Sequence, residues 1–154
     1  MTPKIKFRIE QDDGFPPIRA ELLNATPLHG GHFRLENAPY FAQGASYHDI
    51  VHAVETGLPG VYAFDHVVER SEFIGLSIII LDDAVDARLD AALEGKECIV
   101  EYGEFSGYRV IAVAVPPQVD YTALQLQLSE LEHLDLISLA ELRASAPRPV
   151  HQDA

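Results

Sequence analysis

Two histidines in the first half of the chain have a spacing that can bind zinc. His48-Asp49-Ile50-Val51-His52 resembles the H-E-x-x-H motif, with aspartate in place of glutamate. That motif needs a helix, because a helix places residues i and i+4 on one face beside the acid. This segment is β-branched and flanked by strand signals, and along a strand the two histidines would stand about 13 Å apart. We therefore expect two half-exposed strand histidines, no bound metal and no cofactor.

A second histidine pair, His29-Gly30-Gly31-His32, lies in a predicted hairpin turn. It would add metal ligands only if a barrel folded it over His48. A metal-dependent enzyme that uses His29, His32, His48 and His52 therefore stays open as an alternative. The same string partly matches the H-G-G-G oxyanion loop of esterases, but the chain has no G-x-S-x-G nucleophile elbow. A hydrolase of that type is excluded.

The single cysteine, Cys98, lies on a predicted strand with Glu97 and Glu101 nearby. Acidic neighbours raise the pKa of a thiol, so we expect a packed core thiol and not a nucleophile. One cysteine also excludes an internal disulfide framework.

Acidic residues dominate the second half of the chain. Residues 1–70 contain six Lys and Arg against nine Asp and Glu, whereas residues 71–154 contain five against fifteen, and the whole chain carries a net charge of −13. A field of this sign repels nucleic acid and anionic membranes and steers basic partners inward. We therefore expect a basic protein partner, no nucleic acid and no membrane.

The predicted partner-binding residues form a stripe on one helix and the strand that follows it. They are Asp83, Asp86, Asp90, Glu94 and Glu97 on the helix side and Glu101 and Glu104 on the strand. The alternative interpretation is a solvated helix face, which charge runs usually are. A merely soluble helix usually mixes signs, however, and here only Arg88 and Lys96 interrupt the acids.

Residues 1–70 have the pattern of short strands that would position the histidines. Apolar and polar residues alternate over 5–9 and 18–22, with Ile18, Ala20 and Leu22 on the predicted inward face. Three further strands are expected, separated by turns rich in glycine and proline, over 33–35, 49–55 and 61–69. Short strands at this spacing predict a small bent β-sheet or barrel.

Residues 71–143 alternate between strand and helix patterns. The expected elements are a strand over 74–81, a helix over 85–94, a hairpin of 98–105 with 108–115, a helix from about Asp120, and a last strand over 136–139. This order is that of a ferredoxin-like βαββαβ unit, with an antiparallel sheet and both helices on one face. The predicted fold class is therefore α+β.

The chain is expected to divide into three parts. Residues 1–70 would form a mainly β subdomain, residues 71–143 the ferredoxin-like subdomain, and residues 144–154 a flexible tail. The longest apolar run, residues 76–81, is too short to span a bilayer, and the N-terminal residues lack the pattern of a secretory signal. A cytoplasmic location is the expectation.

Three strings resemble a bacterial family known only as a domain of unknown function, four-two-six-five in the usual domain numbering. They are Asp13-Gly14-Phe15-Pro16-Pro17, Leu35-Glu36-Asn37-Ala38-Pro39-Tyr40-Phe41-Ala42-Gln43-Gly44 and Ser46-Tyr47-His48-Asp49-Ile50-Val51. The resemblance runs from about residue 4 to 143, through Val67–Ser71 and Val115–Tyr121. It departs at residues 72–76, where a polar turn is expected. The family has no assigned activity, and immunity partners of secreted toxins are the members expected by analogy.

The leading hypothesis is a non-enzymatic acidic protein that binds a basic partner. Its most specific form is an immunity protein that neutralises a cognate toxin acting on nucleic acid or nucleotides, since the substrate cleft of such a toxin must be positive. The alternatives are the metal-dependent enzyme described above and a self-associating regulatory domain. The last rests on the leucine-rich second helix, where Leu126 and Leu134 add apolar surface suited to a homodimer.

Overall fold

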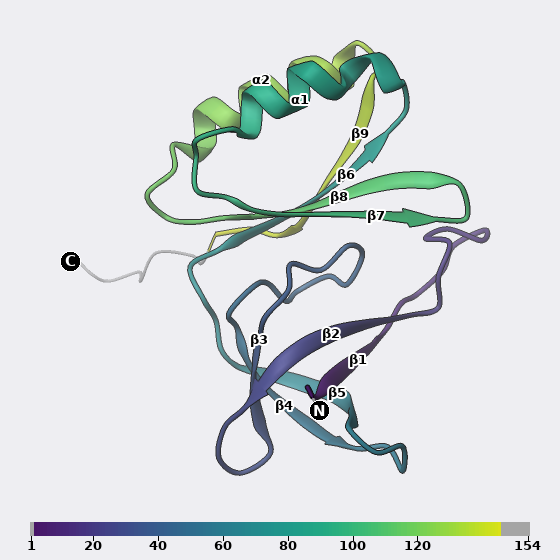
Figure 1. Ribbon diagram of the computed structural model, residues 1–154, viewed down its shortest axis with the longest axis vertical. Coiled ribbons are helices and arrows are strands. Elements are labelled where there is room, and N and C mark those ends of the chain that lie inside the picture. The colour runs from purple at the N-terminus through teal and green to yellow at the C-terminus, as the bar shows by residue number, and fades with distance from the viewer. Residues whose placement is uncertain (1, 146–154) are drawn as a thin grey trace, which may run out of the picture.

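The computed structural model describes residues 2–145 of the 154-residue chain (Figure 1). It is a mixed α+β structure made mostly of strands, with two short helices, as the sequence predicts. A closed five-stranded barrel is followed along the chain by a four-stranded sheet. Most of the predicted tail, residues 146–154, lies outside the described part. Of the helices in residues 2–145, none is long and apolar enough to cross a membrane.

The barrel consists of five consecutive strands, each antiparallel to the next. They are β1 (Lys4–Arg8), β2 (Ala20–Pro27), β3 (His32–Leu35), β4 (Ile50–Glu55) and β5 (Val61–Glu69). An antiparallel run of five leaves the first and last strands parallel, and β1 closes the barrel by pairing with β5 in that direction. Every second residue points inward, so that Ile5, Phe7, Leu35 and Val51 fill the interior.

The inward face of β2 differs from the prediction by one residue. Glu21, Leu23 and Ala25 are buried, whereas Leu22 is 52% exposed. The prediction that Ala20 and Leu22 lie on the inward face is therefore wrong. A one-residue shift in phase exchanges the two faces of a strand, and here a carboxylate occupies an inward position.

The second sheet has strand order β7-β8-β6-β9, and all neighbouring strands are antiparallel. Its elements are β6 (Ile74–Ile80), a 3-10 turn η1 (Asp83–Val85), α1 (Asp86–Leu93), β7 (Ile99–Phe105), β8 (Tyr108–Val115), α2 (Tyr121–His133) and β9 (Ile137–Arg143). Strand β9 extends four residues beyond the predicted end at Leu139. Its pairing with β6 contains a register shift at Gly75/Leu76, and beyond Leu139 two adjacent residues are exposed before the buried Leu142, so the alternation is lost.

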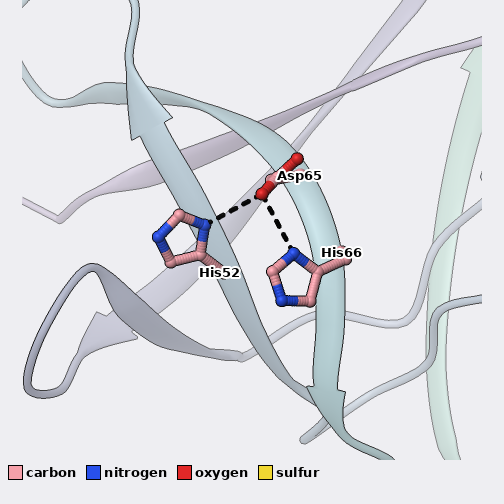
Figure 2. A group of neighbouring side chains, drawn as sticks. All are labelled: His52, Asp65 and His66. Atoms are coloured by element: carbon pink, nitrogen blue, oxygen red, sulfur yellow. Dashed lines mark hydrogen bonds and ion pairs between the residues drawn. The ribbon is translucent and has the colours of Figure 1, made fainter.

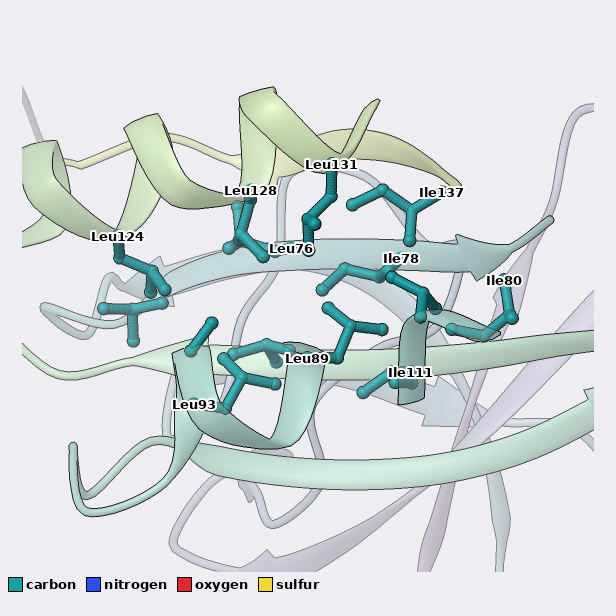
Figure 3. Close-up of a cluster of buried hydrophobic side chains, with 14 of the residues drawn as sticks. Leu76, Ile78, Ile80, Leu89, Leu93, Ile111, Leu124, Leu128, Leu131 and Ile137 are labelled. Carbon is teal, nitrogen blue, oxygen red and sulfur yellow. The ribbon is translucent and has the colours of Figure 1, made fainter. Parts of the chain in front are cut away.

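Both helices cover one face of this sheet and bury the largest of the three hydrophobic clusters in the described residues (Figures 1 and 3). Leu89 and Leu93 of α1 lie with Leu124, Leu128 and Leu131 of α2 against the β6, β8 and β9 side chains. Side-chain carboxylates cap both helical segments. Asp82 accepts from the Ala84 N–H at 2.9 Å before η1, and Asp120 accepts from the Ala123 N–H at 3.1 Å before α2.

The other face of the sheet packs on the barrel. Val110 of β8 and Ile79 of β6 join the barrel core, while Ala112 and Ala114 of β8 pack with Ala38 from the loop between β3 and β4. The sheet therefore lies between the helices and the barrel (Figure 1). Small side chains at these positions let the loop approach the sheet closely.

Candidate functional site

The acidic residues at the start of α1 share one helix face. Asp83, Asp86, Asp90 and Glu94 are spaced by three or four residues, which brings their side chains to one side of the helical segment. All four are exposed. Asp83 and Asp86 both bind Arg109 of β8, with Nη1 to Asp83 Oδ1 at 2.6 Å and Nη2 to Asp86 Oδ1 at 3.2 Å. This end of the stripe is partly neutralised.

The next turn of α1 carries carboxylates beside an exposed aromatic ring. Asp90 and Glu94 line a shallow depression of about 380 Å³ together with Leu93, Val100 and Tyr102. Tyr102 of β7 is 66% exposed. An apolar floor with an aromatic side chain and two carboxylates at its edge suits contact with a basic protein surface.

Strand periodicity decides which β7 residues reach this surface. Val100, Tyr102 and Glu104 point to the helix side of the sheet, and Glu104 is exposed opposite Arg109. Together these exposed side chains form the acidic face, which consists of Asp83, Asp86, Asp90, Glu94 and Glu104 with Tyr102 among them.

Two predicted stripe residues lie elsewhere. Glu101 points to the barrel side of β7, where its carboxylate accepts from the Ala38 N–H at 3.0 Å and the Asn37 amide at 3.2 Å. Assigning it to the stripe was wrong, because residues 101 and 104 are an odd number apart on one strand. Glu97 follows α1 and accepts from the side chain of Gln118 at 2.8 Å, in the loop before α2.

Of the two histidines predicted to lie on a strand, only His52 does so. No helix forms over residues 46–54, and His52 lies on β4 while His48 precedes it with a left-handed backbone of φ 68°. His48 stacks on Tyr47 with ring centroids 3.9 Å apart, and its Nε2 lies 3.3 Å from Glu36 Oε1. The partners of His48 are therefore Tyr47 and Glu36, and they differ from those of His52.

His52 has partners on the neighbouring strand instead. Its Nδ1 lies 3.1 Å from Asp65 Oδ2, and the Nδ1 of His66 lies 2.9 Å from the same oxygen (Figure 2). The hydrogen bonds from His66 and His52 hold the pKa of Asp65 below its ordinary value. Within residues 2–145, His52, Asp65 and His66 are the group whose potential metal-ligand atoms all lie within 4.8 Å of one another. His29, His32 and His48 are not members of this group, so the alternative four-histidine site does not assemble among the described residues.

Sequence reasoning missed the burial of Glu21. Glu21 is 5% exposed and accepts three backbone N–H groups, from Tyr40, Phe41 at 3.0 Å and Ala42 at 3.0 Å. Burial raises the pKa of Glu21, and the three hydrogen bonds oppose that shift only in part. Its position between Ala20 and Leu22 gives no signal in the sequence, because an inward glutamate is identified only when its backbone partners are known. Glu21 holds the 40–42 loop and takes no part in the acidic face.

Two further predictions concern Cys98 and α2. The pKa of the Cys98 thiol is raised, as expected, but burial is the cause and not the acidic neighbours. The positive charge of Lys96 lowers the same pKa and opposes part of this shift. The thiol is half-buried against the helix-side core. Leu126 is 69% exposed and Leu134 is 51% exposed, so the apolar surface proposed for self-association is present on α2, and the homodimer itself stays a prediction.

A solved structure has the same fold. The "novel crystal structure of a hypothetical protein from Neisseria gonorrhoeae" aligns with a TM-score of 0.77 and 22% identity, covering 96% of this chain and 98% of that chain. At this identity the likeness establishes the fold alone. No curated protein matches the chain significantly.

The family resemblance is confirmed over most of its predicted range. A domain of unknown function, DUF4265, matches residues 21–138, which is well over half of the chain. The matched range includes the strings around Leu35–Gly44 and Ser46–Val51 and excludes Asp13–Pro17. The chain belongs to the DUF4265 family, whose activity is unknown.

Proposed function

We propose that this chain is a non-enzymatic acidic protein of the bacterial cytoplasm that binds a basic protein partner through the acidic face. In its most specific form it is an immunity protein that neutralises a toxin acting on nucleic acid or nucleotides. The observation that carries the proposal is the exposed Tyr102 ring beside Asp90 and Glu94.

Few cations oppose the charge of this half of the protein. Residues 71–145 contain four Lys and Arg: Arg88, Lys96, Arg109 and Arg143. Arg143 is buried against Asp49, and Arg109 is held by Asp83 and Asp86. Two cations then remain against the exposed carboxylates of α1, β7 and α2, and this imbalance supports a field that attracts basic surfaces.

An aromatic side chain distinguishes this surface from a merely solvated one. Charged residues alone keep a helix in solution, but an exposed tyrosine over an apolar floor adds nothing to solubility. Tyrosine is enriched among residues that contribute most to protein–protein affinity, and surrounding charges set the association rate. A toxin that binds polyanions has a positive cleft, so carboxylates compete there with the phosphates of its substrate.

We propose further that residues 71–143 are a ferredoxin-like unit. Support comes from the element order strand, helix, strand, strand, helix, strand and from the strand order β7-β8-β6-β9. In this arrangement the first helix and the edge strand β7 are adjacent, and the acidic face spans both.

The test uses a charge-reversed variant that leaves the Arg109 ion pairs intact. Asp90→Lys with Glu94→Lys changes the net charge by +4 at the acidic face, and Glu55→Lys with Glu69→Lys makes the same change at exposed positions of β4 and β5. The partner is taken as the basic protein encoded by the adjacent gene. We expect the first pair to slow association at low salt and to remove most of its salt dependence, while the control pair has a much smaller effect.

Growth provides the functional readout. Expression of the adjacent gene product alone should arrest cells, and co-expression of the wild-type chain or of the Glu55→Lys/Glu69→Lys control should restore growth. The Asp90→Lys/Glu94→Lys variant should fail to do so. Equal association rates for both charge-reversed proteins would contradict the proposed surface, and absence of any binding to the adjacent gene product would contradict the immunity function.

A further inference from the structure

Three neighbouring barrel strands carry histidines side by side. His32 on β3 pairs in register with His52 on β4, and His52 pairs in register with His66 on β5. The ring centroids lie 5.8 Å and 5.3 Å apart. Residues directly opposite one another on paired strands have Cβ atoms about 5 Å apart, whereas positions i and i+4 of one strand are far apart. Cross-strand pairing thus achieves the convergence that the His48/His52 spacing does not.

A β-bulge adds a carboxylate to this row. His52 is opposite His66, but Ala53 is opposite Phe64, so Asp65 is an extra residue in β5. In a regular strand Asp65 and His66 would point to opposite faces, and the bulge lets both point outward. The Asp65 carboxylate lies between the two imidazoles (Figure 2).

The spacing of these atoms suits a small transition-metal ion. Both Nδ1 atoms lie 2.9–3.1 Å from Asp65 Oδ2, and all three ligand atoms lie within 4.8 Å of one another. In a tetrahedral zinc site with bonds of about 2.0–2.2 Å, neighbouring ligand atoms are about 3.3–3.5 Å apart. The N–O distances therefore need to open by only a few tenths of an ångström. The side chains are 31%, 53% and 60% exposed, which leaves room for that adjustment.

We propose that His52, Asp65 and His66 bind one divalent late transition-metal ion, with zinc as the matching ion. Two imidazole nitrogens and one carboxylate oxygen form a donor set that zinc accepts, whereas magnesium and calcium prefer oxygen ligands alone. Three protein ligands leave a fourth coordination position open to water or to a group from another molecule. The site lies on the barrel, on elements different from those of the acidic face, and does not depend on the proposed function.

Zinc binding to the untagged full-length chain tests the proposal, measured by isothermal titration calorimetry with zinc chloride. We expect one zinc per chain for the wild type. His52→Ala and His66→Ala should each weaken binding at least tenfold, since loss of even an outer partner of a metal ligand costs about 10- to 100-fold. His133→Ala removes an exposed histidine of α2 and should bind zinc as the wild type does.

A second measurement separates metal binding from loss of fold. Zinc should raise the melting temperature of the wild type and of the His133→Ala control, and should have little effect on the His52 and His66 variants. Asp65→Asn keeps the size of the side chain while removing the anionic ligand, so it reports on the site if an alanine variant fails to fold. Absence of stoichiometric binding, or equal weakening by His133→Ala, would overturn the proposal.

Discussion

A buried ion pair joins the barrel to the last strand of the second sheet, and breaking it should cost more than any surface change. Arg143 of β9 binds Asp49 through two contacts, Nη1 to Oδ2 at 2.7 Å and Nη2 to Oδ1 at 2.9 Å. The two side chains are 4% and 0% exposed. Arg143 Nη2 also donates to the carbonyls of Ser71 and Phe73, and Asp49 accepts from the Ser71 N–H at 2.8 Å.

The substitution Asp49→Asn preserves shape and leaves the buried guanidinium without its counter-charge. Removing one partner of a buried pair costs about 3–5 kcal/mol. For a chain of about this length, each kcal/mol lowers the melting temperature by about 2–4 °C, so the expected loss is about 6–20 °C. Asp49→Asn combined with Arg143→Met removes both charges and should be clearly more stable than the single variant, because no uncompensated charge remains.

An exposed ion pair is the matched control. Arg109→Gln breaks the contact with Asp83, whose side chain is 82% exposed, and should cost at most about 1 kcal/mol. Urea unfolding would be followed by far-UV circular dichroism and by tyrosine fluorescence, since the chain has six tyrosines and no tryptophan. An Asp49→Asn variant within 1 kcal/mol of the wild type would refute the reasoning, as would a double variant no more stable than Asp49→Asn alone.

Two further predictions concern polar groups inside or beside the core. Glu21→Ala leaves the N–H groups of Tyr40, Phe41 and Ala42 without their acceptor. The substitution should lower the free energy of unfolding by about 3 kcal/mol or more, measured by the same urea titration. A loss below about 1 kcal/mol would show that water replaces the carboxylate. Burial and the hydrogen bond to Glu141 raise the pKa of Tyr121 above its usual value. The native state then holds more protons than the unfolded state above about pH 10, so stability falls as pH rises there, and Tyr121→Phe should make the fall shallower; an identical slope in both proteins would contradict this.

The bounds of some strands could be predicted from the sequence. Strands β5 and β8 agree with the expected ranges 61–69 and 108–115, because a turn that ends in glycine precedes each of them. Both helices form where they are predicted, and Leu89, Leu124 and Leu128 are buried on their inner faces. Local periodicity determines these elements, so one sequence suffices to predict them.

The face of the sheet to which each strand residue points was predicted less well. Glu21 is buried because three N–H groups from a loop twenty residues away need an acceptor, and alternation alone favours the more apolar Leu22 in its place. Glu101 was predicted to lie on the acidic stripe with Glu104. On a strand, however, residues 101 and 104 point to opposite faces, and Glu101 accepts hydrogen bonds from Asn37 and Ala38 on the barrel side. Both errors arise from partners distant in sequence.

The histidine site shows the same limit. His52 and His66 are fourteen positions apart, and Asp65 reaches them only through a bulge in β5. The i, i+4 spacing in the sequence pairs His52 with His48, but the His48 imidazole lies beside Glu36 instead. The chemistry of a sheet surface depends on register, which a single sequence specifies only weakly.

The strings that carry the family resemblance lie largely at the junction of barrel and sheet. Ala38 packs on β8, the 40–42 loop binds Glu21, and Asp49 binds Arg143. The Ala38 and Asp49 contacts join the barrel to the second sheet, whereas the Glu21 contact holds a loop of the barrel itself. The acidic face and the histidine site lie outside those strings but inside the matched range of residues 21–138. Because the activity of the family is unknown, what this chain binds must be tested on its own side chains, at Tyr102 and His66 above all.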